Sequence, residues 1–134
     1  MNDKELLNLA ENARKNAYAP YSGITVGAAL LSEDGEVYLG ANVENASFGA
    51  TVCAERAALF SAVSCGKRRF SAIAIVGGRK NEAPRDSFTP CGICRQCLSE
   101  FSDGTLRVIT ERNGKPEAKP ISELLPYGFS KDLL

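Results

Sequence analysis

Cysteines are the residues of this sequence most able to do chemistry, and they stand at positions 53, 65, 91, 94 and 97. Three of them recur every third residue in the segment T-P-C-G-I-C-R-Q-C at 89–97. Such a segment fits a redox pair, the start of an iron–sulfur ligand run, or half of a metal site. The further cysteine before a proline, which the iron–sulfur motif adds, is absent. The choice therefore depends on whether the rest of the chain supplies another ligand and an acid.

A second cysteine lies in the segment C-A-E-R at 53–56, which is expected to open a helix, as Cys91 is expected to open another. Unpaired N–H groups and the helix dipole favour a thiolate at such a position by ~0.3–1 kcal/mol. If the two helices lie side by side, Cys53, Cys91 and Cys94 can converge. Three sulfurs and one open position give the geometry of a catalytic zinc site.

Glu55 decides between a structural and a catalytic metal site. A structural zinc site needs no carboxylate two residues after a ligand, whereas zinc lowers the pKa of a bound water toward about 7. Glu55 could take that proton and pass it to a leaving group, which contributes typically ~10²–10⁴-fold to the rate. Three thiolates leave the site net negative, and Arg56 is expected to offset this charge by donating hydrogen bonds to ligand sulfurs.

The other residues narrow the choice of chemistry. Cys97 is expected to be a small buried helix residue, and Cys65 a core residue or a helix end. The chain has no histidine, which excludes Cys–His nucleophile pairs and metal sites of the HExxH type. Taken alone, Cys91-x-x-Cys94 is as consistent with a structural metal site as with a catalytic one.

Hydrophobic periodicity and turn residues predict the elements that must position these groups. Pro20 ends the first helix, Glu33-Asp34-Gly35 forms a hairpin turn, and the apolar run before Gly78 is a buried central strand. The expected fold is a three-layer α/β/α sandwich around a five-stranded mixed sheet. The predicted helices cover 3–17, 54–63, a segment from Cys91 to before Asp103, and 121–125; the predicted strands cover 24–32, 36–43, 71–78, 105–111 and a short segment after Asn113-Gly114.

The length and charge of the chain limit the domain organisation and the partners that it can have. A chain of 134 residues is expected to form a single domain over 1–134 and needs no disulfides to fold. Its 16 basic residues balance 16 acidic ones, so no nucleic-acid polymer is expected as a partner. The charged N-terminus does not resemble a signal peptide, and no apolar run reaches the ~20 residues that cross a bilayer. We therefore expect a cytoplasmic protein without a membrane partner, whose cysteines stay reduced.

At these residues the sequence resembles the small, homotetrameric, three-cysteine cytidine deaminases over nearly its whole length. The paired zinc motif is the one known for nucleobase deaminases. The motifs that carry the resemblance are Y-A-P-Y-S at 18–22, V-G-A-A-L-L at 26–31, N-V-E-N at 42–45, C-A-E-R at 53–56, P-C-G-I-C-R-Q at 90–96 and E-L-L-P at 123–126.

The resemblance implies hydrolytic deamination of cytidine and 2′-deoxycytidine to uridine and 2′-deoxyuridine, with release of ammonia, in pyrimidine salvage. It implies one Zn²⁺ per subunit on the three cysteines named above, with Glu55 moving protons to ring N3 and the leaving amine. The resemblance also implies that Asn42 and Glu44 bind the ribose hydroxyl, which is compatible with alternate strand residues pointing to one face. The Ala54 N–H would donate to the pyrimidine carbonyl.

The resemblance also implies a homotetramer with shared active sites. Phe129 is then the candidate ring that a neighbour stacks over the base, and Phe48 is a second candidate from a neighbour. One position departs from the family pattern, because Ile24 stands where an aromatic residue is usual. An aliphatic side chain still packs against a ring but loses the aromatic edge geometry.

Two other functions remain open at this point. A deaminase of a modified cytosine nucleoside, of the blasticidin S type, would share the zinc motif and Glu55 without needing N-V-E-N. A structural zinc module would instead predict that replacing Glu55 has no effect. Polynucleotide editing is disfavoured, because the charge is balanced and no aromatic-basic groove is evident.

Overall fold

A computed structural model describes all 134 residues, which form a five-stranded mixed sheet with the strand order β2-β1-β3-β4-β5. Only β3 and β4 are parallel, and the other neighbouring strands are antiparallel. The strands are β1 (Ile24–Ser32), β2 (Val37–Ala41), β3 (Phe70–Arg79), β4 (Arg107–Arg112) and β5 (Lys115–Pro120). The helices are α1 (Asp3–Arg14), α2 (Ala54–Ser64), α3 (Gly92–Glu100) and α4 (Ile121–Leu124), with short 3₁₀ turns at Phe48–Ala50 and Lys131–Leu133. Every predicted element is present, and the predicted central strand is β3, in the middle of the sheet.

Helix α1 ends three residues earlier than predicted. It begins with a capping box, in which the Asn2 side chain accepts from the Glu5 N–H and the Glu5 carboxylate accepts from the Asn2 N–H. After Arg14 the chain tightens, and the N–H of Ala17 bonds to the carbonyl three residues back at 3.1 Å. The N–H of Tyr18 then donates to the carbonyl of Asn42. Contact with the segment that follows β2 therefore accompanies the end of the helix before Pro20 is reached.

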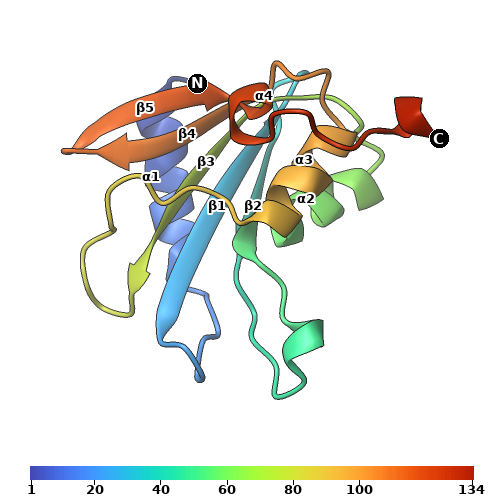
Figure 1. Cartoon of the computed structure of the whole chain (residues 1–134). Coiled ribbons are helices and arrows are strands. Elements are labelled where there is room, and N and C mark those ends of the chain that lie inside the picture. The colour runs from blue at the N-terminus through green and yellow to red at the C-terminus, as the bar shows by residue number, and fades with distance from the viewer.

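The layers are those of an α/β/α sandwich (Figure 1). Helix α1 covers one face of the sheet, where its leucines join the odd-numbered residues of β1 in one core cluster. Helices α2 and α3 cover the other face, and the even-numbered residues of β1 join them in the larger core cluster. The three-layer sandwich predicted from the sequence is confirmed. None of the helices combines the length and the apolar character needed to span a bilayer.

Two glycines allow the helices to lie unusually close to the sheet. A Cβ at Gly27 would lie 1.9 Å from the carbonyl oxygen of Ala10 in α1. A Cβ at Gly40 would lie 2.3 Å from the carbonyl oxygen of Ala54 in α2. Both contacts are with backbone atoms, which cannot move without the rest of their helix. Only glycine therefore fits where α1 crosses Gly27 and where α2 crosses Gly40.

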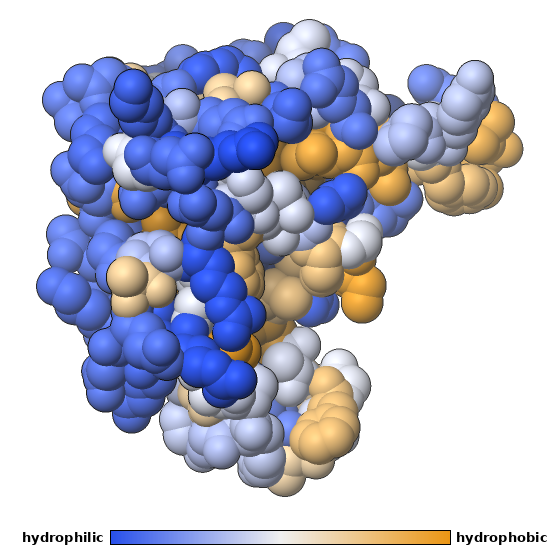
Figure 2. All heavy atoms as spheres, turned by 60° about the vertical axis from the view of Figure 1, so that its left-hand side comes forward, coloured by the Kyte–Doolittle hydropathy of each residue, from blue (hydrophilic) through white to orange (hydrophobic).

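Hydrophobic side chains are unevenly distributed on the surface. Figure 2 shows them gathered on the flank that carries the projecting C-terminal end, whereas the part of the surface facing the viewer is mostly hydrophilic. The exposed large hydrophobic residues include Phe48, Ile93, Tyr127 and Phe129, which lie in the 44–52 loop, in α3 and in the C-terminal segment.

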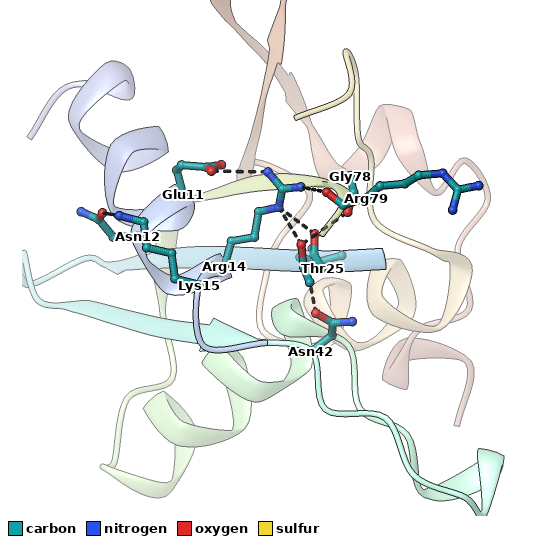
Figure 3. A network of polar contacts seen from close by, with 9 residues as sticks. Glu11, Asn12, Arg14, Lys15, Thr25, Asn42, Gly78 and Arg79 are labelled. Atoms are coloured by element: carbon teal, nitrogen blue, oxygen red, sulfur yellow. Dashed lines mark hydrogen bonds and ion pairs between the residues drawn. The ribbon is translucent and has the colours of Figure 1, made fainter. Parts of the chain in front are cut away.

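A buried arginine joins α1 to the start of β1 and the end of β3 (Figure 3). Only 5% of Arg14 is exposed, and its Nε donates to the carbonyl and the hydroxyl of Thr25 at 3.0 and 2.9 Å. Its Nη2 donates to the carbonyl of Arg79 at 2.7 Å. The buried cation is thus matched to oxygen acceptors, as a buried charge requires. The network holds together the end of the sheet at which Asn42 lies.

Candidate active site

The N-termini of α2 and α3 each begin at a cysteine. Cys53 is the N-cap of α2 and Cys91 the N-cap of α3, both with extended backbone. Neither side chain makes a capping hydrogen bond to its own helix. The two sulfurs are therefore free for another role, at positions where helix dipoles favour negative charge.

The sequence-predicted metal ligands come together. The Sγ atoms of Cys53, Cys91 and Cys94 all lie within 4.8 Å of one another, and none is in a disulfide. Cys53 Sγ and Cys91 Sγ are 3.8 Å apart. Tetrahedral zinc with Zn–S bonds of ~2.3 Å places its sulfurs ~3.8 Å apart. The chemistry and the spacing of this donor set therefore fit a zinc ion.

The surroundings of Cys53 stabilise its thiolate. The pKa of Cys53 falls to about 5, chiefly because the Cys94 thiol donates a hydrogen bond to its sulfur, with a further contribution from Arg56. Sharing that proton raises the pKa of Cys94. Nη2 of Arg56 lies 3.3 Å from Cys53 Sγ, and its Nε is buried without a hydrogen-bond partner. The predicted contact between Arg56 and a ligand sulfur is present.

Glu55 lies in the first turn of α2 and is 4% exposed. Burial raises its pKa to about 7, against smaller opposing contributions that include its own backbone N–H. A buried carboxyl without a salt-bridge partner is unusual in a stable fold and typical of a proton-transfer site. Ala54, the first residue of α2, is fully buried, and its N–H has no acceptor within the helix.

A cavity of about 370 Å³ lies beside the loop that leads to α2. This volume falls in the range of small-molecule sites. The cavity is lined by Tyr21, Ser22, Glu44, Phe48 and Thr51. The ring of Phe48 packs edge-on against Tyr21, with centroids 6.0 Å apart. Phe48, expected to serve a neighbouring subunit, thus lines a cavity together with Glu44 of its own chain.

Asn42 and Ile24 meet at the edge of this region. The Asn42 side chain is 7% exposed; its Oδ1 accepts from the Val26 N–H at 2.8 Å and its Nδ2 donates to the Ile24 carbonyl at 2.9 Å. One N–H and one lone pair of the amide are left over. The Ile24 side chain packs against the core cluster on the same sheet face as α2 and α3.

The remaining predicted residues lie farther along the chain. Phe129 is 56% exposed in the C-terminal segment, and its carbonyl accepts from Gln96 of α3 at 2.8 Å. The structure does not bring Phe129 into the cavity of its own chain, where it is absent from the lining residues. Cys97 is half-buried against the core, and Cys65 is the exposed C-cap of α2, the helix end expected of it.

Two residues that position the site were missed from the sequence. Arg95 donates to the carbonyl of Pro90 at 2.7 Å and to that of Leu124 at 2.8 Å, so it fixes the residue before Cys91 and ties α3 to α4. Ser22 hydrogen-bonds to Glu44. Both lie inside motifs quoted above, but hydrophobic periodicity says nothing about long-range polar contacts.

An α/β/α sandwich that presents three thiols and a buried carboxyl at adjoining helix N-termini fits the class of zinc enzymes that have an acid beside the metal. The family model for the cytidine and deoxycytidylate deaminase zinc-binding region matches residues 1–110. The chain belongs to this family. The family binds zinc, in agreement with the three-cysteine cluster.

Individual relatives agree with this assignment. The cytidine deaminase of Sporosarcina psychrophila is 45% identical over 98% of this chain and 94% of its own. That of Halalkalibacterium halodurans is also 45% identical, over 98% of this chain and 97% of its own. The crystal structure of cytidine deaminase from Burkholderia pseudomallei superposes with a TM-score of 0.86 at 45% identity, covering 96% of this chain and 100% of the other. That from Mycobacterium tuberculosis gives a TM-score of 0.80 at 38% identity, with 96% and 98% covered.

Proposed function

We propose that this protein hydrolyses the exocyclic C–N bond of cytidine and 2′-deoxycytidine, giving uridine or 2′-deoxyuridine and ammonia for pyrimidine salvage. The observation that carries this proposal is the convergence of three sulfurs from two helices next to a buried glutamate, in a chain that is 45% identical to cytidine deaminases over 98% of its length. In this proposal residues 1–134 are one domain.

Cys53, Cys91 and Cys94 would hold the zinc ion. When bound, zinc supplies a Lewis acid that lowers the pKa of water toward neutrality. Glu55 takes a proton from the attacking water, delivers it to ring N3, and then transfers a proton to the leaving amine, so that water adds its oxygen as ammonia departs. Its burial excludes bulk water, which would otherwise compete for these protons.

The nucleoside is oriented by groups around the cavity. The free N–H of Ala54 donates to the pyrimidine carbonyl, and Asn42 and Glu44 bind a sugar hydroxyl. Asn42 keeps one N–H for this purpose, while its other amide contacts hold the start of β1 in place. Ile24 and Phe48 supply apolar contact for the nucleoside.

A homotetramer with shared sites accounts for the exposed hydrophobic flank. Phe129 at 56% and Ile93 at 61% exposure are costly in water, and a second copy of the chain could cover them. Phe129 would then stack over the base in a neighbouring site. Light scattering on the purified protein tests the tetramer, and Phe129→Ala should raise KM for cytidine. We also propose that the protein works in the cytoplasm, where its ligand thiols stay reduced.

An ultraviolet assay on a small panel of substrates tests the reaction. We expect cytidine and 2′-deoxycytidine to be deaminated by enzyme that contains about one zinc per chain. Turnover of blasticidin S without turnover of cytidine would assign the rival specificity. Zinc-loaded protein that turns over none of these compounds would contradict the proposed function.

A further inference from the structure

The carboxylate of Glu44 is held by the loop that precedes β1. Its Oε1 accepts from the N–H of Tyr21 at 2.9 Å and from the N–H of Ser22 at 3.0 Å. Its Oε2 accepts from the hydroxyl of Ser22. These three contacts span more than twenty residues of sequence, so they fix a side chain of the 42–45 segment against the 18–23 turn.

The direction of the Ser22 hydroxyl is determined by its neighbours. The N–H of Ile24 donates to Ser22 Oγ at 3.0 Å. A hydroxyl has one proton to donate. Because the Ile24 N–H can only donate, it occupies a lone pair of Oγ, and the hydroxyl proton is directed to Glu44. The hydrogen bonds from Ser22 and Tyr21 also keep the pKa of Glu44 below its usual range, so the carboxylate stays ionised and acts as an acceptor only.

The number of acceptor positions left on Glu44 follows from these contacts. An ionised carboxylate offers about four lone-pair positions. Two on Oε1 and one on Oε2 are occupied, which leaves one on Oε2. Glu44 and Ser22 both line the cavity of about 370 Å³.

We propose that Ser22 orients Glu44 so that its carboxylate accepts a hydrogen bond from a single hydroxyl of the nucleoside sugar, which makes Ser22 a specificity-determining positioning residue. This inference rests on the proposed function. It implies that one of the two ring hydroxyls, 2′ or 3′, is recognised here and that the other is not.

Steady-state kinetics with cytidine, 2′-deoxycytidine and 3′-deoxycytidine tests the inference. Ser22→Ala should raise KM for cytidine roughly five- to tenfold, with kcat within about twofold of wild type, because two of the three contacts on Glu44 remain. The deoxy analogue that lacks the recognised hydroxyl should bind wild type weakly and show no further loss in Ser22→Ala. The other analogue should lose affinity as cytidine does.

Two further variants separate positioning from general loss of structure. Ser22→Thr keeps the hydroxyl and should restore KM to within about twofold of wild type. Ser102→Ala is a matched control, because Ser102 Oγ also accepts from the N–H two residues on, at 3.0 Å, in a turn outside the cavity. It should leave KM unchanged. Ser22→Gly also lacks the hydroxyl and repeats the test if Ser22→Ala folds poorly.

The outcomes distinguish this inference from the proposed function. An equal rise of KM on all three nucleosides, a fall in kcat alone, or no change in Ser22→Ala would overturn the role of Ser22 while deamination stands. Wild-type enzyme that deaminates none of the nucleosides would remove the proposed function, and this inference with it.

Discussion

The guanidinium of Arg56 donates a hydrogen bond to the sulfur of Cys53 over 3.3 Å, one turn along α2 from the cysteine that caps it. Its second, buried nitrogen, Nε, has no partner. Three thiolates around a dication carry a net negative charge, which works against the acidification of water. Arg56 is the one cation placed to offset it by direct contact with a ligand sulfur.

Replacement of Arg56 should therefore weaken metal binding. We expect Arg56→Ala to lose about 10–100-fold in zinc affinity, the usual effect of removing a hydrogen bond to a ligand. Arg56→Lys keeps the charge without the planar donor geometry, so its zinc affinity should lie between those of wild type and Arg56→Ala. Competition with a chromogenic chelator measures the affinity. Unchanged zinc affinity and unchanged turnover in Arg56→Ala would contradict this role.

The close crossing of α2 over Gly40 should position the active site, whereas that of α1 over Gly27 should not. Gly40→Ala pushes a methyl group into the Ala54 carbonyl, which follows Cys53 directly. Gly27→Ala makes an even closer clash, but with α1 on the opposite face of the sheet. Both variants should lose roughly 1–3 kcal/mol of unfolding free energy through overpacking.

Only Gly40→Ala should also lower zinc affinity and kcat per folded molecule. Denaturant unfolding gives the stability of each variant, and zinc titration of the folded fraction gives the metal affinity. If Gly27→Ala impaired zinc binding as much as Gly40→Ala, the effect would be general loosening of the fold and the positioning role would be wrong.

The contact of Asp34, in the turn between β1 and β2, with Lys67 should make the free energy of unfolding depend on pH in the acid range. The Lys67 ammonium, followed by the Ser32 hydroxyl, lowers the pKa of Asp34 to about 2. A lowered pKa contributes stability that is complete above the unfolded value near 3.8 and is lost as pH falls toward 2. At about pH 6 the Tm of Asp34→Asn should therefore be lower than that of wild type. This difference in Tm should shrink between about pH 4 and pH 2. The contact is exposed, so added salt should also reduce the difference. A constant difference at all pH values would exclude this origin.

Ile24 offers a test of the base-binding face. The Ile24 side chain lies on the sheet face shared with α2 and α3. Ile24→Phe should lower KM for cytidine by roughly three- to tenfold, the worth of an aromatic contact. Ile24→Leu, which stays aliphatic, serves as control and should leave KM near wild type. A raised KM in a folded Ile24→Phe would show that the ring does not fit.

Local patterns predicted the elements, the three-cysteine cluster and the contact of Arg56 with a ligand sulfur, but not the other polar contacts that orient the site. The β-branched and apolar residues of β1 and the apolar run of β3 up to Gly77-Gly78 predict those strands from nearby residues alone. The two cysteine segments specify the cluster because each begins a helix. Ser22 with Glu44, and Arg95 with Leu124, are more than twenty residues apart in sequence, so only the folded chain brings them together. For the same reason the end of α1 at Arg14 followed from a contact with Asn42 and not from Pro20.

In the proposed reaction Glu55 carries the protons beside a metal held by three cysteines. Glu55→Gln keeps the size of the side chain and removes the proton-transfer group. We expect zinc content equal to wild type and a fall in kcat for cytidine of at least about 10²-fold. Cys94→Ala, in contrast, should lose zinc and activity together. A Glu55→Gln enzyme that retains both zinc and wild-type turnover would show that Glu55 is not the proton carrier.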